Sequence, residues 1–355
     1  MGSVNEDLVG KVITVLGPIE AEALGLTLCH EHLLISLLVW WLEPEAATEK
    51  AAAYEPVSIS NLGRLRRNPH AVRDNLVMDD VDLAIKEALR FRRAEGRTIV
   101  DVTSIGIGRD PLALRTIAIE TGLHIVAGCG YYVHLCHPPD IDYKTIDDIA
   151  AEMVRDLTEG IDYTGVRAGI IGEIGTFDPI MPNEVKVLRA AARAQRQTGA
   201  PIIIHPHPFS RLGLQILDIL EEDGADLNQV IMSHLDLTLD EDLVYHQAIA
   251  HRGAYVCYDG WGNEGYYERF NGFSLPKDVE RVRGVQKLIA AGYLDRVLLS
   301  HDIFAKMLLT AYGGFGYAHL LETVRPIFRQ AGLTEAHINT MMIENPQRVL
   351  AWRPV

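Results

Sequence analysis

Residues 168–207 of the chain read AGIIGEIGTFDPIMPNEVKVLRAAARAQRQTGAPIIIHPH. Two short apolar runs, residues 168–175 and 201–207, flank residues 184–195, whose apolar side chains recur with the period of a helix. A strand, a helix and a second strand in this order predict a parallel βαβ unit, because parallel strands need a long crossover between them.

The helical segments carry start and stop signals. Pro182 and Asn183 open the helix of this unit, with Asn183 as the expected N-cap, and Asp110 and Pro111 open another helix. Gly199 follows the helical residues, as expected of a residue that ends a helix in the left-handed conformation. These signals support an alternation of strands and helices.

The same alternation recurs along the whole chain. Apolar runs predict eight strands, at residues 26–32, 98–104, 124–132, 168–175, 201–207, 230–236, 254–259 and 297–302. Helical periodicity lies between most of them, for example at residues 81–94, 184–195, 212–222 and 279–291. Eight strand–helix units favour an α/β fold of the (β/α)₈ TIM barrel type. The alternative is an open doubly wound sheet, whose usual GxGxxG or GxxxxGK[ST] motif is absent from the sequence.

The chain has 355 residues, more than the ~250 of a typical barrel. No low-complexity linker divides it, so we expect a single barrel domain over residues 1–355. Residues 33–78 are expected as a loop insertion after the first strand, and residues 260–276 and 303–317 as long loops after strands seven and eight. All three would extend the C-terminal face of the barrel, where barrel enzymes build their active sites.

Composition excludes several classes of protein. The net charge of -15 argues against a nucleic-acid groove and against docking on anionic lipid, so a small-molecule substrate is the expected partner. No apolar run reaches the ~18 residues of a membrane span, and the N-terminal stretch lacks the pattern of a signal peptide. None of the four cysteines forms a CxxC pair, and three lie in or beside apolar runs, where free cysteine is commonly buried. We therefore expect reduced thiols. A cytoplasmic location is therefore expected.

Polar residues gather where five of the predicted strands end. In a barrel these ends point into one mouth. The residues are His30, His32, Glu173, His205, His234 and Asp302. Alone, a strand histidine is more often a hydrogen-bonded core residue, and an aspartate after a strand is more often an N-cap. Together, four histidines and two carboxylates match the ligands that zinc prefers.

Six ligands suit two ions that lie ~3.5–4 Å apart and share a bridging carboxylate. We therefore expect two divalent metal ions per chain. Zinc is the expected metal, and cobalt and manganese accept the same ligands.

At these residues the chain resembles the phosphotriesterase family of the amidohydrolase superfamily, and most closely its phosphotriesterase-related branch. The resemblance runs over nearly the whole chain. It rests on the opening stretch Gly10-Lys-Val-Ile-Thr-Val-Leu-Gly17, on His30-Glu-His32, Asp101-Val-Thr-Ser, Gly106-Ile-Gly-Arg109-Asp110 and Gly169-Ile-Ile-Gly-Glu173-Ile-Gly175, and on Ser233-His234-Leu-Asp236, His301-Asp302-Ile and Tyr312-Gly-Gly-Phe-Gly-Tyr317.

The resemblance implies a role for each ligand. His30, His32 and Asp302 would hold the buried metal, and His205 and His234 would hold the outer one. The best-known members bridge the metals with a carbamylated lysine, and here Glu173 would take that role, as in the related branch. Homodimers are usual in the family.

The sequence departs from the organophosphate-cleaving members on strand seven. Those members carry a histidine there that relays a proton, whereas this chain reads Tyr258-Asp259-Gly260-Trp261. The departure weakens the expectation of a phosphotriesterase activity.

The expected function is a binuclear-metal hydrolase that uses a metal-bridging hydroxide to cleave a carboxyl ester, a lactone or an amide. Asp302 would hold the hydroxide and accept its proton. The alternatives are a phosphotriesterase and, more remotely, a non-enzymatic barrel that binds a small molecule. A serine hydrolase is disfavoured because no GxSxG motif occurs.

Loop residues are expected to border the substrate. These are Tyr131, Tyr132, Trp261 and Lys306. The polar neighbours of the ligands have less certain roles. His207 would line the mouth or support a ligand, Asp236 would orient a histidine or bind substrate, and Asp259 would act as a support. Glu31 and His301 are expected to face away from the ligands and to be structural.

Overall fold

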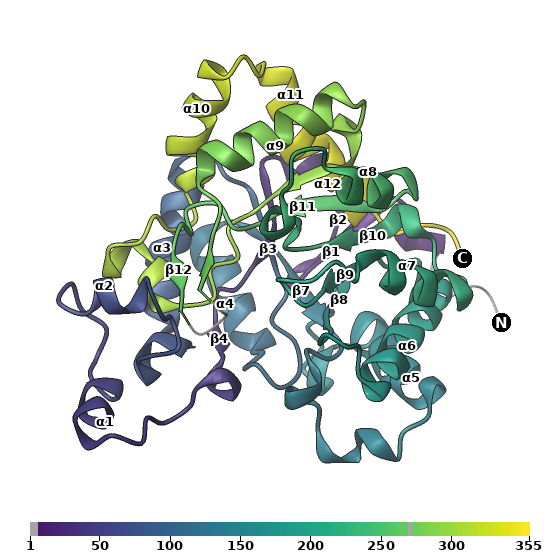
Figure 1. Cartoon of the computed structure of the whole chain (residues 1–355). Helices are drawn as coiled ribbons and strands as arrows, with labels where there is room; N and C mark the ends of the chain where they lie inside the picture. The colour runs from purple at the N-terminus through teal and green to yellow at the C-terminus, as the bar shows by residue number, and fades with distance from the viewer. Residues whose placement is uncertain (1–5, 269–271) are drawn as a thin grey trace.

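The computed structural model describes residues 6–268 and 272–355 (Figure 1). Its central sheet has eight strands, all parallel to their neighbours, in the order of the chain. The strands are β3 (Thr27–Glu31), β6 (Thr98–Asp101), β7 (His124–Cys129), β8 (Ile170–Gly175), β9 (Ile202–His205), β10 (Val230–Met232), β11 (Tyr255–Tyr258) and β14 (Val297–Leu299). The eight predicted strands and the (β/α)₈ barrel are confirmed.

The barrel closes where β3 meets β14, through side chains in place of a strand ladder. The Ser300 hydroxyl accepts a hydrogen bond from the His30 backbone N–H at 3.0 Å and donates to the His30 carbonyl at 2.7 Å. Glu31 accepts the backbone N–H groups of His301 and Ile303 at 2.7 and 3.1 Å. This seam brings the ends of the first and last strands together.

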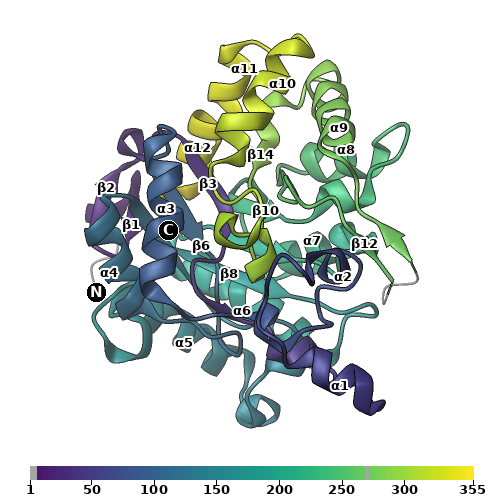
Figure 2. The ribbon, with the colours of Figure 1, turned by 90° about the vertical axis from the view of Figure 1, so that its left-hand side faces the viewer.

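Helices cover the outside of the barrel (Figures 1 and 2). Those between successive strands are α3 (Val81–Arg93), α4 (Pro111–Thr121), α5 (Ile146–Thr158), α6 (Pro182–Thr198), α7 (Gly213–Glu222), α8 (Val244–His251) and α9 (Asp278–Ala290). After β14 come α10 (Arg325–Gln330), α11 (Glu335–Asn339) and α12 (Asn345–Leu350). Asp110 caps α4 as expected, and Gly199 ends α6 with φ 73°.

One helix boundary was predicted wrongly. Asn183 is not the N-cap of α6, because the helix begins at Pro182, two residues earlier than that cap requires, and Met181 is the cap residue. The fixed φ of proline suits the first helical position. The cap is supplied by Glu184, whose carboxylate accepts the backbone N–H groups of Met181 and Phe177 at 2.8 and 2.9 Å.

Short elements fill the long loops. Residues 33–78 contain β4 (Ile35–Ser36), α1 (Ala47–Ala53), α2 (Leu62–Leu65) and β5 (Val77–Met78), with β4 and β5 paired antiparallel. After β11 lies a hairpin of β12 (Tyr266–Tyr267) and β13 (Phe273–Ser274). Before the barrel, β1 (Lys11–Thr14) and β2 (Gly17–Glu20) form another hairpin. Figure 2 shows α2 beside β12, on one side of the molecule.

Residues 1–5, on which the expectation of a missing signal peptide partly rests, lie outside the described residues. Among the described helices, none combines the length and the apolar character that crossing a bilayer requires.

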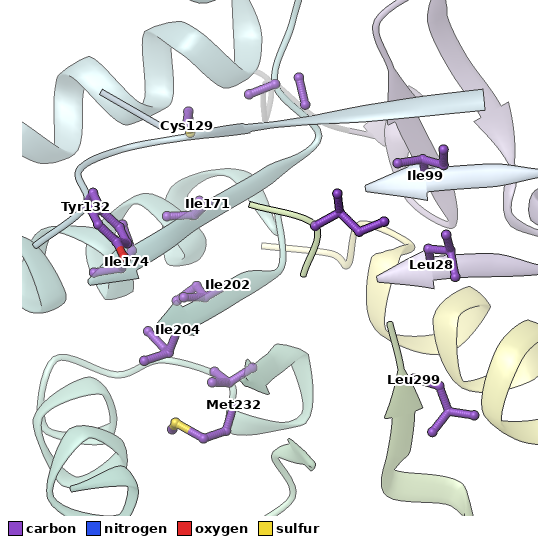
Figure 3. Packing of buried hydrophobic residues seen from close by; sticks show 14 of the residues in the cluster. Leu28, Ile99, Cys129, Tyr132, Ile171, Ile174, Ile202, Ile204, Met232 and Leu299 are labelled. Atoms are coloured by element: carbon purple, nitrogen blue, oxygen red, sulfur yellow. The ribbon is translucent and has the colours of Figure 1, made fainter. Parts of the chain in front are cut away.

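The core has two layers, set by the alternation of side chains along each strand. Ile202 and Ile204 of β9 pack in the larger cluster, which also contains residues of the surrounding helices (Figure 3). Ile203 belongs to a second cluster to which all eight barrel strands contribute, and this cluster fills the interior. His205 lies two residues beyond Ile203, so the alternation places it on the inner face at the C-terminal mouth.

Candidate metal centre

Three groups of three side chains at the mouth could each hold a metal ion: two groups that share no residue, and a third, His30, His234 and Asp259, that overlaps both. The first is His30, His32 and Asp302, and in it Asp302 Oδ1 lies 3.7 Å from His30 Nε2 and 3.3 Å from His32 Nε2. These residues come from the two sides of the β3–β14 seam. The closure of the barrel is therefore what assembles this group.

The second group is Glu173, His205 and His234. His205 Nδ1 lies 3.0 Å from Glu173 Oε2 and 2.7 Å from His234 Nε2. Glu173 also reaches the first group, with Oε2 3.3 Å from His30 Nε2 and Oε1 3.5 Å from His32 Nε2. The Glu173 carboxylate thus contacts histidines of both groups.

The donor atoms fit metal ions better than they fit one another. His234 Nδ1 bonds Asp259 at 3.0 Å, so its Nε2 presents a lone pair to His205 Nδ1, another potential acceptor. The buried Nε2 of His30 has no hydrogen-bond partner among the described residues. Unpaired buried nitrogens that face carboxylates are the arrangement a divalent cation completes.

Polar partners fix the ring orientations. Asp259 accepts hydrogen bonds from the ring Nδ1 and the backbone N–H of His234, each at 3.0 Å, and His30 Nδ1 lies 3.0 Å from Asp259 Oδ2 and 2.9 Å from the Ser233 hydroxyl. Thr103 Oγ1 lies 2.8 Å from His32 Nδ1, and the Tyr132 hydroxyl lies 3.2 Å from His205 Nε2. Such bonds to the far nitrogen set the tautomer and the direction of a metal-binding imidazole.

The neighbouring histidines keep the Glu173 carboxylate anionic. Burial alone would raise the pKa of Glu173, but the neighbouring histidines, His205 foremost, outweigh it, and the pKa lies well below its usual range. Burial lowers the pKa of His205. At His30 burial opposes protonation, yet the Asp259 carboxylate outweighs it and raises the pKa well above the usual value. Without metal, therefore, protons compete for the ligand nitrogens.

Backbone conformations also mark the site. His234 and Asp302 have φ of 58° and 52°, in the left-handed region that L-residues seldom adopt. Such conformations cost of order 1–3 kcal/mol each and gather at functional sites. Gly172, with φ 116°, precedes Glu173, and a Cβ there would clash with the carbonyl of Ile203. Glycine thus allows β8 to approach β9 where Glu173 enters the site.

A buried ion pair underlies Asp259. Arg281 of α9 donates from Nε to Asp236 Oδ2 at 2.7 Å, and Asp236 Oδ1 accepts the backbone N–H of Asp259 at 3.2 Å. A Cβ at Gly260 would lie 2.5 Å from Asp236 and 2.6 Å from Arg281 Nη2. Arg281 thus fills the space that a strand-seven side chain would occupy. Asp236 supports the residue that orients the histidines.

The two groups open into a cavity of about 270 Å³. Its walls include Tyr132, as expected of a substrate-bordering residue, and His207. Of the six expected ligands, five line it, and His30 lies buried beneath. The expectation that His207 lines the mouth agrees with this placement.

Three residues expected at the substrate do not line the cavity. Tyr131 is buried, and its hydroxyl donates to Glu152. Trp261 is buried against Phe328 at a ring distance of 5.3 Å. Lys306 forms an ion pair with Asp74 at 2.6 Å. Sequence placed all three in the correct loops but could not give the direction of a loop side chain.

Glu31 and His301 are structural, as expected. Glu31 Oε1 lies 2.8 Å from His301 Nδ1 and 2.7 Å from the Ser300 hydroxyl oxygen. Sequence reasoning missed Thr103 and Arg281. Thr103 follows the second barrel strand at the mouth, which could have indicated it, whereas Arg281 lies on an ordinary amphipathic helix and gave no signal.

Comparison with known proteins agrees with this geometry. A profile described as "Phosphotriesterase family" matches residues 10–350. N-acetyltaurine hydrolase of Danio rerio is 39% identical over 349 residues, which cover 98% of this chain and 99% of that protein.

Two crystal structures are similar over nearly their whole length. A resiniferatoxin-binding protein from Rhodobacter sphaeroides is 42% identical, with a TM-score of 0.94 and coverage of 99% of this chain and 98% of that one. A mutant of a phosphotriesterase-like lactonase from Deinococcus radiodurans is 28% identical, with a TM-score of 0.76 and coverage of 96% and 99%.

The family match and the similarity to hydrolases and lactonases show that the chain is a hydrolytic enzyme. The chain belongs to the phosphotriesterase family.

Proposed function

We propose that this hydrolase holds two divalent metal ions, zinc foremost, and cleaves an amide bond. One observation carries the proposal: Glu173 contacts both groups of candidate ligands, at 3.3 Å from His30 Nε2 and 3.0 Å from His205 Nδ1. A carboxylate shared by two ligand groups is what a two-metal site needs.

His30, His32 and Asp302 would hold one ion and His205 and His234 the other, with Glu173 between them. When bound, such ions lower the pKa of a coordinated water and polarise a substrate carbonyl. The side chain of Asp302 is 19% exposed, whereas those of His30, His32 and Glu173 are at most 2% exposed. Asp302 is thus the carboxylate placed to accept a proton from water in the cavity.

The amide is favoured by the relatives. N-acetyltaurine hydrolases are named for an acetamide, and the one from Danio rerio matches this chain over 98% of its length. An ester or a lactone is the second candidate, favoured by the similarity to a lactonase. A phosphotriester is disfavoured because strand seven has no histidine to relay a proton. Gly260 follows that strand, and Arg281 fills the space beside it.

The test is a comparison of substrate classes on one metal-loaded preparation. We expect the best carbonyl substrate to exceed the best phosphotriester in kcat/KM by at least ~100-fold, or about 2.7 kcal/mol. Among carbonyl substrates, amides should be cleaved by the unaltered protein. The Asp302→Asn variant should not cleave them. A phosphotriester cleaved as fast as the best amide, ester or lactone would contradict the proposed bond class.

A further inference from the structure

Apolar side chains make up much of the cavity wall above the candidate ligands, alongside polar ones such as His207 and Asn263. Trp40 and Phe177 form one wall, with ring centroids 5.7 Å apart. On another wall Phe209 packs against Phe273 at 4.5 Å. Leu275, from the hairpin after β11, also lines the cavity. Aromatic walls on separate loops, around a space of about 270 Å³, suit a hydrocarbon group.

Apart from the two proposed metal ions, the cavity offers little positive charge to the anionic end of a substrate. Among the described residues that line the cavity, Arg281 is the sole lysine or arginine. Its guanidinium already bonds Asp236 at 2.7 Å, Asp278 at 3.2 Å and the Asn263 carbonyl at 3.0 Å, and its side chain is fully buried. Two carboxylates therefore more than neutralise this cation. The net charge of -15 further disfavours an anionic substrate.

We infer that the substrate is uncharged and carries an apolar arm, which packs between the Trp40–Phe177 wall and the Phe209 wall. The inference rests on the proposed function for the bond that is cleaved. It departs from what the relatives' name suggests, because taurine carries a sulfonate. The loop side chains would then decide which substrate binds, whereas the candidate metal ligands would not distinguish one carbonyl substrate from another.

A matched pair of acetamides tests the inference. N-butylacetamide and N-acetyltaurine have amine arms of similar length, but the first arm ends in a hydrocarbon and the second in a sulfonate. On metal-loaded enzyme we expect kcat/KM to favour the neutral amide by at least ~10-fold. Lengthening the acyl or the amine arm should raise kcat/KM by about 4-fold per methylene until the cavity is filled.

Two variants test which side chains contact the apolar arm of the substrate. Phe209→Ala removes a wall of the cavity and should lower the gain in kcat/KM per methylene. The control is Phe315→Ala, an exposed phenylalanine that does not line the cavity, and it should keep the gain of the unaltered protein. An equal effect of both variants would overturn the placement of the arm.

A binding measurement separates this inference from the proposed function. The probes are ketones in which a methylene replaces the amide nitrogen, one with a butyl arm and one with an ethylsulfonate arm, and calorimetry gives their affinities for the metal-loaded protein. Tighter binding of the butyl ketone supports the inference even if no amide is cleaved, which would contradict the proposed function alone. Preference for the sulfonate, in binding or in hydrolysis, would overturn the inference and leave the proposed function intact.

Discussion

Glu173 is the residue on which both ligand groups depend. In an apolar strand a buried carboxylate is costly unless a cation or hydrogen bonds compensate it, and the surrounding histidines hold its pKa well below the usual range. The cost is understandable if Glu173 lies between two dications. As a plain carboxylate it would need no carbon dioxide to form the bridge.

Glu173→Gln removes the anionic charge and should lower the metal content below two ions per chain, because each ion loses an anionic ligand. Mass spectrometry of the metals after reconstitution measures the content, and added bicarbonate should not change it for the unaltered protein. The matched control is Glu87→Gln, a buried carboxylate that accepts hydrogen bonds from Thr310 and Ala311 away from the site. The control should lose stability and keep its metal; a Glu173→Gln variant that behaves in the same way would remove Glu173 from the site.

Individual residues show how far sequence reasoning reaches. The six candidate ligands were predictable because each follows an apolar strand, and barrel strands end at one mouth. Tyr131, Trp261 and Lys306 were placed in the right loops, but loop side chains take their direction from tertiary packing. The clamp of Arg281 on Asp236 was out of reach because it joins a helix residue to a strand end 45 positions away.

At the scale of elements, helix α8 is tied to the barrel by a buried histidine. His246 bonds the Tyr258 hydroxyl of β11 at 2.8 Å and the Thr238 hydroxyl at 2.9 Å. Burial lowers the pKa of His246 to about 4. The folded protein therefore keeps this histidine neutral at pH values where the unfolded chain protonates it.

This shift predicts a pH dependence of stability. Above the unfolded pKa of ~6.5 the contribution of His246 is complete, and it is lost as the pH falls toward about 4. Over that range the free energy of unfolding should fall by about 3 kcal/mol on account of this residue. Denaturant titrations of His246→Gln should lack this part of the decline, and exposed His251→Gln should retain it. Equal pH profiles for the two variants would show that His246 is not the group responsible.

Strands and helices were more predictable than their ends. The eight strands followed from apolar runs, since buried parallel strands read as continuous apolar segments. The start of α6 was missed by two residues, because Glu184 supplies the cap from inside the helix and Asn183 does not. The seam between β3 and β14 was not predictable either, since the side chains of Ser300 and Glu31 form it.

In the whole molecule, barrel closure and the proposed metal binding involve the same residues. His30 and Asp302 stand on opposite sides of the seam, and the Asp302 backbone N–H donates to the His30 carbonyl at 3.2 Å. A metal held by both would strengthen the seam, because binding to the folded state alone adds to its stability. The account therefore predicts that metal removal affects activity and stability together.

Metal content and hydrolysis measured on the same samples test whether hydrolysis depends on two metal ions per chain. The chain as purified, after prolonged chelation and after reconstitution with zinc or cobalt is assayed for metals by mass spectrometry and for cleavage of one amide substrate. The account predicts close to two ions per active chain, loss of hydrolysis with the metals, and its return in proportion to the ions restored. Full hydrolysis by the metal-free protein would contradict it.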